Sequence, residues 1–369
     1  MADEPGDKPP AENPSKKFLD LAAKGKHEWN KWRHANEDEP VNFADVDFSK
    51  APNDQINFSG FEFGDDADFS RCKWRDIPGL EAPADFKPGR ASFAGAVFGS
   101  GANFTGAVFP NWADFTSTTF GLRADFTFVV FDWWANFTSA YFGDLVLFTG
   151  ATFGWKANFT GAAFDNVADF TGAAFNSGAN FEGAVFKGYV SFKGTSGAQW
   201  TESFHNLGLG QDDRNVLSQR HEVTRKSVGV DSASGPDRFL SISFANARFD
   251  REAIFSSRDF EADANFTNAR FYYPPDFDAV NNASRIDFTG AHIGFSRRDA
   301  PRWKKHWTTN TQIPVRLRAF RKIVEETKNH DLERDLYIEE RKAERGVVWR
   351  RLLEVLERDR KNSRRNSKI

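Results

Sequence analysis

Phenylalanine recurs at a fixed spacing through the middle of this chain, and that spacing limits the folds that the chain can adopt. When residues 91–200 are written in ten lines of eleven, Phe occupies the third position of every line, from Phe93 to Phe192. Phe also occupies the eighth position of nine lines, from Phe98 to Phe186. Successive rings are therefore alternately five and six residues apart. So regular a period is typical of a protein built from stacked repeats.

An α-helix does not fit this period, whereas a short β-strand does. Steps of five and six residues rotate by about 140° and 240° around a helix, so the rings would share no face. In the recurring sequence Ala-Asn-Phe-Thr-Gly, a strand places Ala and Phe on one side and Asn and Thr on the other. The glycine then permits a corner. Short strands joined by corners predict a solenoid whose coils stack about 4.8 Å apart.

The recurring motifs A(N/D)FTG and A(V/A)F resemble those of the pentapeptide-repeat proteins, over residues 41–194 and 239–295. The resemblance implies a mainly β fold, a right-handed quadrilateral β-helix in which the central Phe and the small residue two before it face inward. Every second unit here has a sixth residue, so two lines of eleven predict a coil of 22 residues. Two opposite internal columns should then form, one of Phe93, Phe115, Phe137, Phe159 and Phe181, the other of Phe104, Phe126, Phe148, Phe170 and Phe192.

Composition divides the chain into six segments. We expect, in order, a disordered Pro-rich tail at 1–15, an N-terminal capping helix at 16–40, repeats at 41–194, an insertion at 195–237, further coils at 238–298, and a C-terminal helical region with a basic tail at 299–369.

Both ends of a solenoid need covering, because an open end would expose strand edges and the core. The capping helix should span 16–36 and bury apolar residues, with Phe18, Leu19, Leu21, Trp29 and Trp32 available. The C-terminal region should contain two or three helices, broken near Asn329 and Gly346. Their apolar residues should also pack against the solenoid.

The sequence contains no motif typical of an enzyme or of a metal site. The seven histidines are scattered, and Cys72 is the only cysteine and is expected to fill a small apolar space. Outward carboxylates such as Asp114, Asp125 and Asp169 alternate with Asn in one column, which favours a hydrogen-bonding role at corners over catalysis. The threonine column from Thr105 to Thr171 fits ordinary strand preference better than an ice-binding face. We therefore predict a protein that is not an enzyme, with no catalytic residue, cofactor or metal.

Charge weighs against nucleic acid as a partner. The formal net charge is −3, and residues 41–194 carry seventeen Asp/Glu against ten Lys/Arg, a net of −7. Some pentapeptide-repeat proteins mimic DNA and bind a type II topoisomerase, but such mimicry requires a much more acidic rod. That function is therefore a less favoured alternative.

The sequence favours the cytoplasm as the compartment. No apolar run approaches the ~20 residues of a membrane helix, and no secretory signal is present. Residues 341–369 have eleven Lys/Arg against four Asp/Glu, a net of +7. Some bacterial family members continue from a similar region into membrane helices. Peripheral contact of 341–369 with the inner membrane, as part of a sensor module, is thus a second alternative.

Four tryptophans occupy repeat positions that should lie at a solvated corner. Trp112 and Trp134 are 22 residues apart, as are Trp133 and Trp155, so each pair should stack on adjacent coils along one edge. Phe128, which also falls outside the internal columns, would extend this surface. We predict that these five residues bind another protein or a second copy of the chain, because tryptophan is enriched among binding hot spots. The alternative is that the chain covers the rings itself, with 195–237 or with the C-terminal helices.

Overall fold

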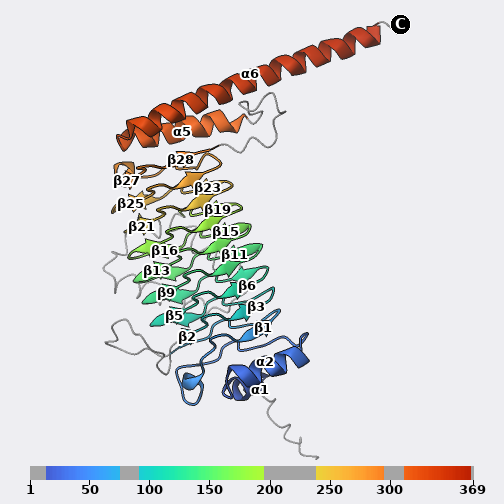
Figure 1. Cartoon of the computed structure of the whole chain (residues 1–369), viewed down its shortest axis with the longest axis vertical. Helices are drawn as coiled ribbons and strands as arrows, with labels where there is room; N and C mark the ends of the chain where they lie inside the picture. Colours follow the sequence, from blue (N-terminus) through green and yellow to red (C-terminus); the bar gives the residue numbers. More distant parts are fainter. Residues whose placement is uncertain (1–13, 75–90, 195–237, 295–310, 367–369) are drawn as a thin grey trace, which may run out of the picture.

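The structure is a computed structural model that describes residues 14–74, 91–194, 238–294 and 311–366, with side chains as far as Val348. Short strands form a rod that has a pair of helices at each end (Figure 1). Every strand pair is parallel, and each strand pairs with the strand one coil further along. The fold is a parallel β-solenoid and is mainly β, as predicted.

Four sheets, which we label A to D, form the four faces of the solenoid. Along the chain, the strands of one coil belong to sheets D, C, A and B in that order. Pairing partners such as Tyr141 and Ala163, or Val146 and Ala168, are 22 residues apart, which confirms the expected coil length. Within the described ranges, short 3-10 helices occur at η1 (Asn53–Gln55) and η2 (Ala283–Arg285).

The strands are assigned to the faces as follows. Sheet D contains β2 (Ala91–Ser92), β5 (Trp112–Asp114), β9 (Trp134–Asn136), β13 (Lys156–Asn158), β17 (Ala179–Asn180), β21 (Ile242–Ser243), β25 (Ala264–Asn265) and β27 (Ile286–Asp287). Sheet C contains β1 (Glu62–Gly64), β3 (Val97–Phe98), β6 (Thr119–Phe120), β10 (Tyr141–Phe142), β14 (Ala163–Phe164), β18 (Val185–Phe186), β22 (Arg248–Phe249), β26 (Arg270–Phe271) and β28 (His292–Ile293). Sheet A contains β7 (Ala124–Asp125), β11 (Leu145–Leu147), β15 (Val167–Asp169), β19 (Val190–Ser191) and β23 (Ala253–Ile254). Sheet B contains β4 (Val108–Phe109), β8 (Val130–Phe131), β12 (Thr152–Phe153), β16 (Ala174–Phe175), β20 (Arg238–Phe239) and β24 (Asp259–Phe260).

Stacked phenylalanine rings fill the interior. Phe93, Phe115 and Phe137 stack 4.8–4.9 Å apart at interplanar angles of 3–4°. Phe104 meets Phe93 edge-on across the core, at 5.6 Å and 88°. The small residue two before each ring, such as Ala91 or Ala102, is buried and leaves room beside it. The two opposite columns predicted from the repeat are therefore confirmed, and sheets B and C each add a further column.

The polar column forms the corners. The backbone N–H of Thr116 donates to Oδ1 of Asp114 at 3.0 Å, and Asp125 and Asp169 accept in the same way at 2.8 Å. The turn that follows is closed by a bond such as Ala96 N–H to the Phe93 carbonyl, 2.9 Å, with Gly95 at φ +65°. The outward carboxylates are thus corner hydrogen-bond acceptors, as expected.

Two helices, not one, cover the N-terminal end. The expected single helix over 16–36 is wrong: α1 (Pro14–Ala22) and α2 (Lys26–Ala35) are separated at Gly25, whose φ of +87° breaks the helical path. Trp29 is fully buried, with its ring 5.3 Å from Phe61 and its Nε1–H bonded to the Glu62 carbonyl at 2.7 Å. Phe18 is also buried, whereas Leu19, Leu21 and Trp32 are only partly buried. This pair of helices caps the first coils.

Removal of residues 1–40 should make the protein associate in a concentration-dependent way. The first coils would then expose the rings that Trp29 covers, together with unpaired strand edges that can pair with another chain. Sedimentation velocity over a range of concentrations measures the effect. Removal of residues 1–13 alone is the control, since it leaves both helices. A truncated protein that stays monomeric at every concentration would refute the capping role.

The solenoid resumes in register on the far side of residues 195–237, which lie outside the described residues. Phe239 of β20 pairs with Phe175 of β16. In an uninterrupted solenoid, the residue 22 positions after Phe175 would make this pairing. Likewise β21 pairs with β17, and Phe244 stacks on Phe181 at 5.0 Å. The coils before and after the interruption therefore share one core.

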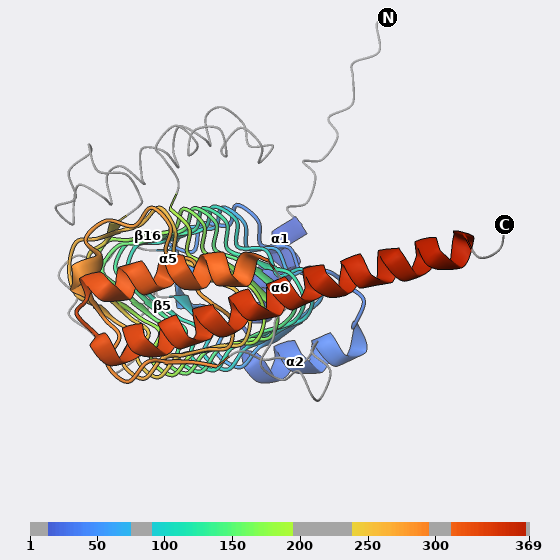
Figure 2. The ribbon, with the colours of Figure 1, turned by 90° about the horizontal axis from the view of Figure 1, so that it is seen from above.

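A second helix pair covers the C-terminal end (Figure 2). In α5 (Gln312–Glu326), Phe320 stacks on Phe277 at 5.4 Å and 11°, so a helix residue takes the place of the next ring in the column. The chain turns at 327–329, the break expected near Asn329. The expected break at Gly346 is wrong, because α6 (His330–Asn366) runs through it and past the solenoid. One glycine costs a helix only about 1 kcal/mol, too little to end it.

Candidate protein interaction edge

The four tryptophans lie together on the corner between sheets B and D, which we call the tryptophan edge. Trp112 of β5 pairs in register with Trp134 of β9, and their rings are 4.5 Å apart with an interplanar angle of 38°. Trp133 and Trp155 precede β9 and β13, and their rings stack at 5.5 Å and 11°. The two stacks expected from the 22-residue period are present, side by side.

Local chain geometry explains why these rings point outward. In β5 and β9 the alanine after each tryptophan is buried in the core, so alternation turns Trp112 and Trp134 to the outer surface. Gly154 precedes Trp155, and a Cβ there would lie 2.1 Å from the carbonyl oxygen of Asp132. The absence of a side chain lets the coils approach closely at this corner.

The edge is apolar yet partly open to solvent. The relative exposure is 44% for Trp133 and 43% for Trp155, whereas Trp112 and Trp134 are half-buried. Lys156 follows Trp134 in the same column, with its ammonium 5.5 Å from the centroid of that ring. Nε1 of Trp134 is buried and has no hydrogen-bond acceptor among the described residues. The rings of Trp133 and Trp155 are therefore available for contact, and the half-buried stack of Trp112 and Trp134 lies beside them.

Phe128 does not belong to this open surface, and its inclusion was wrong. It is only 5% exposed, and it adopts φ +52° at the corner position that is usually glycine. Its ring lies against the corner of the next coil, where a Cβ on Gly150 would meet ring carbon Cε1 at 2.3 Å. Sequence period places Phe128 outside the internal columns, but an outward residue is not necessarily an exposed one.

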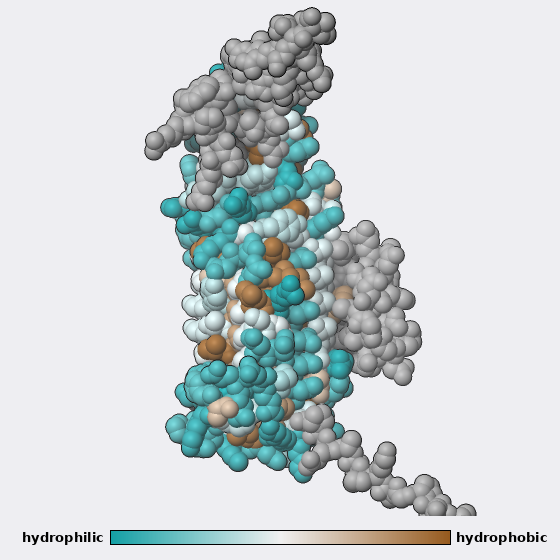
Figure 3. Space-filling view, turned by 90° about the vertical axis from the view of Figure 1, so that its right-hand side faces the viewer, coloured by the Kyte–Doolittle hydropathy of each residue, from teal (hydrophilic) through white to brown (hydrophobic). Residues whose placement is uncertain are grey.

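The face that contains sheet A is mostly polar or small, with an apolar group near its middle (Figure 3). Outward residues of the strands on this side include Leu145, Leu147 and Val167, each of them half-buried. Leu122, at the corner before β7, is 52% exposed but lies in a different coil from these strands. The sequence period did not single out these residues. Leu145 pairs in register with Val167, so these aliphatic side chains form one small group, whereas the four indoles form two ring stacks.

Three titratable side chains meet on the outer surface beside sheet C. Tyr141 and Lys187 both bond the carboxylate of Asp165 on sheet C, and the bond from Lys187, then that from Tyr141, lowers the pKa of Asp165. All three groups are on the open surface of one sheet. Cys72 is fully buried, and burial raises the pKa of its thiol well above the usual value. Its sulfur donates to the Phe43 carbonyl, so it fills the core as a small residue.

Within the described ranges, no group of three or more His, Cys, Asp or Glu side chains is arranged to hold a metal ion. None of the described helices is both long and apolar enough to cross a membrane.

Comparison with known families gives one match. The family model for pentapeptide repeats (9 copies) matches residues 148–196. The coils of that segment continue without a change of register into those before it, and β20 to β28 continue them beyond it. Neither the curated proteins nor the solved structures include a match to this chain.

Proposed function

Because the chain is a pentapeptide-repeat protein, we propose that it acts as a non-enzymatic scaffold that binds another protein through the tryptophan edge. Proteins of this solenoid fold are generally scaffolds without catalytic activity. The observation that carries the proposal is the pair of open rings, Trp133 and Trp155, at 44% and 43% exposure on one corner.

The rigidity of the edge supports this function. Each indole has a stacked partner, and Trp112 and Trp134 are also held by strands in register, so few rotamers are lost when a partner binds. A large aromatic surface that is already ordered is typical of a binding hot spot. The polar Asn and Thr ladder of sheet D lies beside the edge and can form a solvated rim.

Replacement of Trp133 and Trp155 by serine should weaken partner binding by about tenfold or more, because hot-spot tryptophans typically contribute at least 2 kcal/mol. A photo-crosslinking amino acid at Ser177, the next position in the Trp133 column, would capture the partner. Captured protein is then compared between the parent and the double serine variant, with circular dichroism as a check that both remain folded.

The matched control is Leu122→Ser, which removes an exposed apolar side chain from a different corner. Capture of the same protein by the parent and by Leu122→Ser, with loss in the tryptophan variant, would support the proposal. Equal capture by all three variants would contradict it. Capture of the chain itself would make the edge a surface for self-association.

A further inference from the structure

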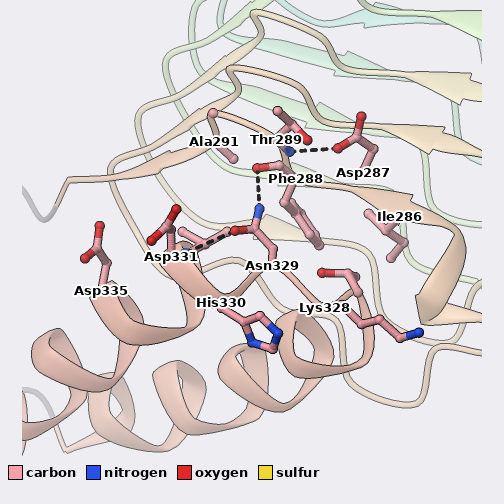
Figure 4. A pocket seen from close by; sticks show the side chains of 13 residues that line it. Ile286, Asp287, Phe288, Thr289, Ala291, Lys328, Asn329, His330, Asp331 and Asp335 are labelled. Carbon is pink, nitrogen blue, oxygen red and sulfur yellow. Dashed lines mark hydrogen bonds between the residues drawn. The ribbon is translucent and has the colours of Figure 1, made fainter.

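A groove lies at the C-terminal end of the solenoid, between the last coil and the start of α6 (Figure 4). Its volume is about 620 Å³, within the range typical of ligand sites. One wall is the last coil from Ile286 to Ala291, and the other is the turn and first helical residues from Thr327 to Asp335. A smaller hollow of about 250 Å³ shares Ala291, Leu332 and Asp335, and extends the groove along β28.

The wall formed by the last coil is an open strand edge. β27 is the terminal strand of sheet D. One coil earlier, the N–H groups of Phe266 and Asn268 donate to the carbonyls of Asp287 and Thr289, at 2.8 and 2.9 Å. The corresponding donors of the last coil are the N–H groups of Phe288 and Gly290. No acceptor for either is present in the described part of the chain, so the groove presents two unused backbone donors.

The helical cap closes the core but leaves this edge open. Phe320 covers the ring of Phe288 edge-on, at 5.3 Å and 83°. The side-chain amide of Asn329 donates to the Phe288 carbonyl at 3.1 Å, and its oxygen accepts from the Leu332 N–H to start α6. These contacts hold α6 at a fixed distance above β27. An extended segment could therefore enter beside β27 without displacing the cap.

Charge indicates what kind of segment would enter. Asp331, Asp335 and Glu339 are spaced by four residues and so follow one face of α6. Asp287 stands on the opposite wall, and the hydrogen bond from the Thr289 side chain is the main cause that lowers the pKa of that carboxyl.

Among the described residues that line the groove, Asp287, Asp331 and Asp335 carry carboxylates and Lys328 carries an ammonium. His330 also lines it. Arg334 reaches Asp331 and Asp335 from outside at 3.3 and 3.7 Å, and Lys342 pairs with Glu339 at 2.8 Å. The ion pairs of Arg334 are largely exposed and therefore weak. The wall that faces β27 favours a positively charged ligand.

We propose that this groove binds an extended basic segment of a partner protein, which adds as a further strand beside β27. The backbone of the segment would accept from Phe288 and Gly290, as in other cases of strand addition to a sheet edge. Its inward side chains must be small, because Phe320 already fills the space above the core. Lysine or arginine at alternate positions would face Asp331 and Asp335.

A fluorescein-labelled peptide of four Ala-Lys repeats is the probe, measured by fluorescence polarisation against the full chain. We expect it to bind, whereas the matching Ala-Glu peptide should not. N-methylation of the alternate residues whose N–H groups face β27 keeps the charge of the Ala-Lys peptide and its carbonyl acceptors. The methyl groups prevent close approach to the strand edge, so binding should weaken by about tenfold. Equal affinity for the methylated and unmethylated peptides would overturn strand addition.

The double variant Asp331→Asn and Asp335→Asn should bind the Ala-Lys peptide about fivefold more weakly than the parent. Both side chains are well exposed, at 89% and 66%, so the fold should be retained. The control pair Asp20→Asn and Glu28→Gln changes net charge by the same amount on the opposite cap and should change affinity by less than about twofold. If both double variants weaken binding equally, the attraction is general and the groove is not the site.

Residues 295–310 of the same chain carry Arg297, Arg298, Arg302, Lys304 and Lys305 and are the competing occupant. The variant Lys304→Gln with Lys305→Gln distinguishes the two. Peptide affinity that is unchanged in this variant supports an external partner. Affinity that rises would show that the chain's own segment occupies the groove and would overturn the proposal.

Discussion

Replacement of Phe148 by alanine should lower the free energy of unfolding by about 3–5 kcal/mol. Phe148 is fully buried, and its ring stacks between Phe126 and Phe170 at 4.8 Å on each side. Phe137 and Phe159 meet it edge-on from the opposite column at 5.5 and 5.6 Å. The strand ladders above and below hold the coil spacing, so the neighbouring rings cannot move inward to fill the cavity. The cost should therefore lie at the high end for a core truncation.

Urea denaturation followed by circular dichroism measures this loss. The control is Val97→Ala, because Val97 is 44% exposed and its truncation should change stability by less than about 0.5 kcal/mol. A solenoid is stabilised mainly by contacts between neighbouring coils, so the loss of one central ring should also reduce the cooperativity of the transition. A decrease of less than about 1 kcal/mol for Phe148→Ala would show that the column can repack, contrary to the geometry described.

The fold could be predicted from the repeat because the same types of residue pack in the same way in each coil. One Phe, one small residue and one corner residue per face specify a strand, an inward direction and a turn, and the 22-residue period then sets the register. The same period also predicts that Trp112 lies over Trp134 and Trp133 over Trp155, and both ring stacks are present. Periodicity is informative wherever the environment repeats.

Prediction was wrong where the environment does not repeat. The break at Gly25 and its absence at Gly346 depend on backbone conformation: Gly25 has a positive φ, whereas Gly346 lies within the long helix α6. Phe128 has the correct period for an outward residue, yet it is buried, with its ring close to Gly150. The end groove could not be predicted either, since it depends on where α6 begins relative to β27.

Arg258 departs from the repeat pattern. It follows the interruption at residues 195–237, and its side chain contacts the coil that precedes that interruption. Its column holds small apolar residues in the preceding coils, Ala107, Val129, Ala151 and Ala173, all of them buried. Arg258 is itself fully buried. In the regular ladder, the N–H of Ala174 donates to the Ala151 carbonyl. The next donor of that ladder would follow Gly194, where the regular coil is interrupted.

The guanidinium donates to backbone carbonyls at this interruption. Nη1 of Arg258 donates to the Ala173 carbonyl at 3.1 Å, the acceptor that the next coil would have used. Nε donates to the carbonyl of Phe192, and Nη2 to that of Lys193 at 3.3 Å. The same group lies 4.7 Å from the ring centroid of Phe239, the first ring after the interruption. Arg258 thus joins the coil before the gap to the coil after it.

Replacement of Arg258 by alanine should therefore destabilise the protein by about 2–5 kcal/mol, although alanine is the residue that the repeat favours in this column. Each buried carbonyl left without a donor costs about 1–3 kcal/mol, and a cavity adds to that cost. Urea denaturation of Arg258→Ala, Arg258→Lys and the parent tests this. Lysine should recover part of the loss, since its ammonium can satisfy some of the same carbonyls but lacks the planar fork.

The matched control is Val129→Ala, which restores alanine in the same column without removing a donor, and should cost no more than about 0.5–2 kcal/mol. If Arg258→Ala were as stable as the parent, the regular repeat would tolerate the interruption without a replacement donor, and Arg258 would have no role in closing the gap.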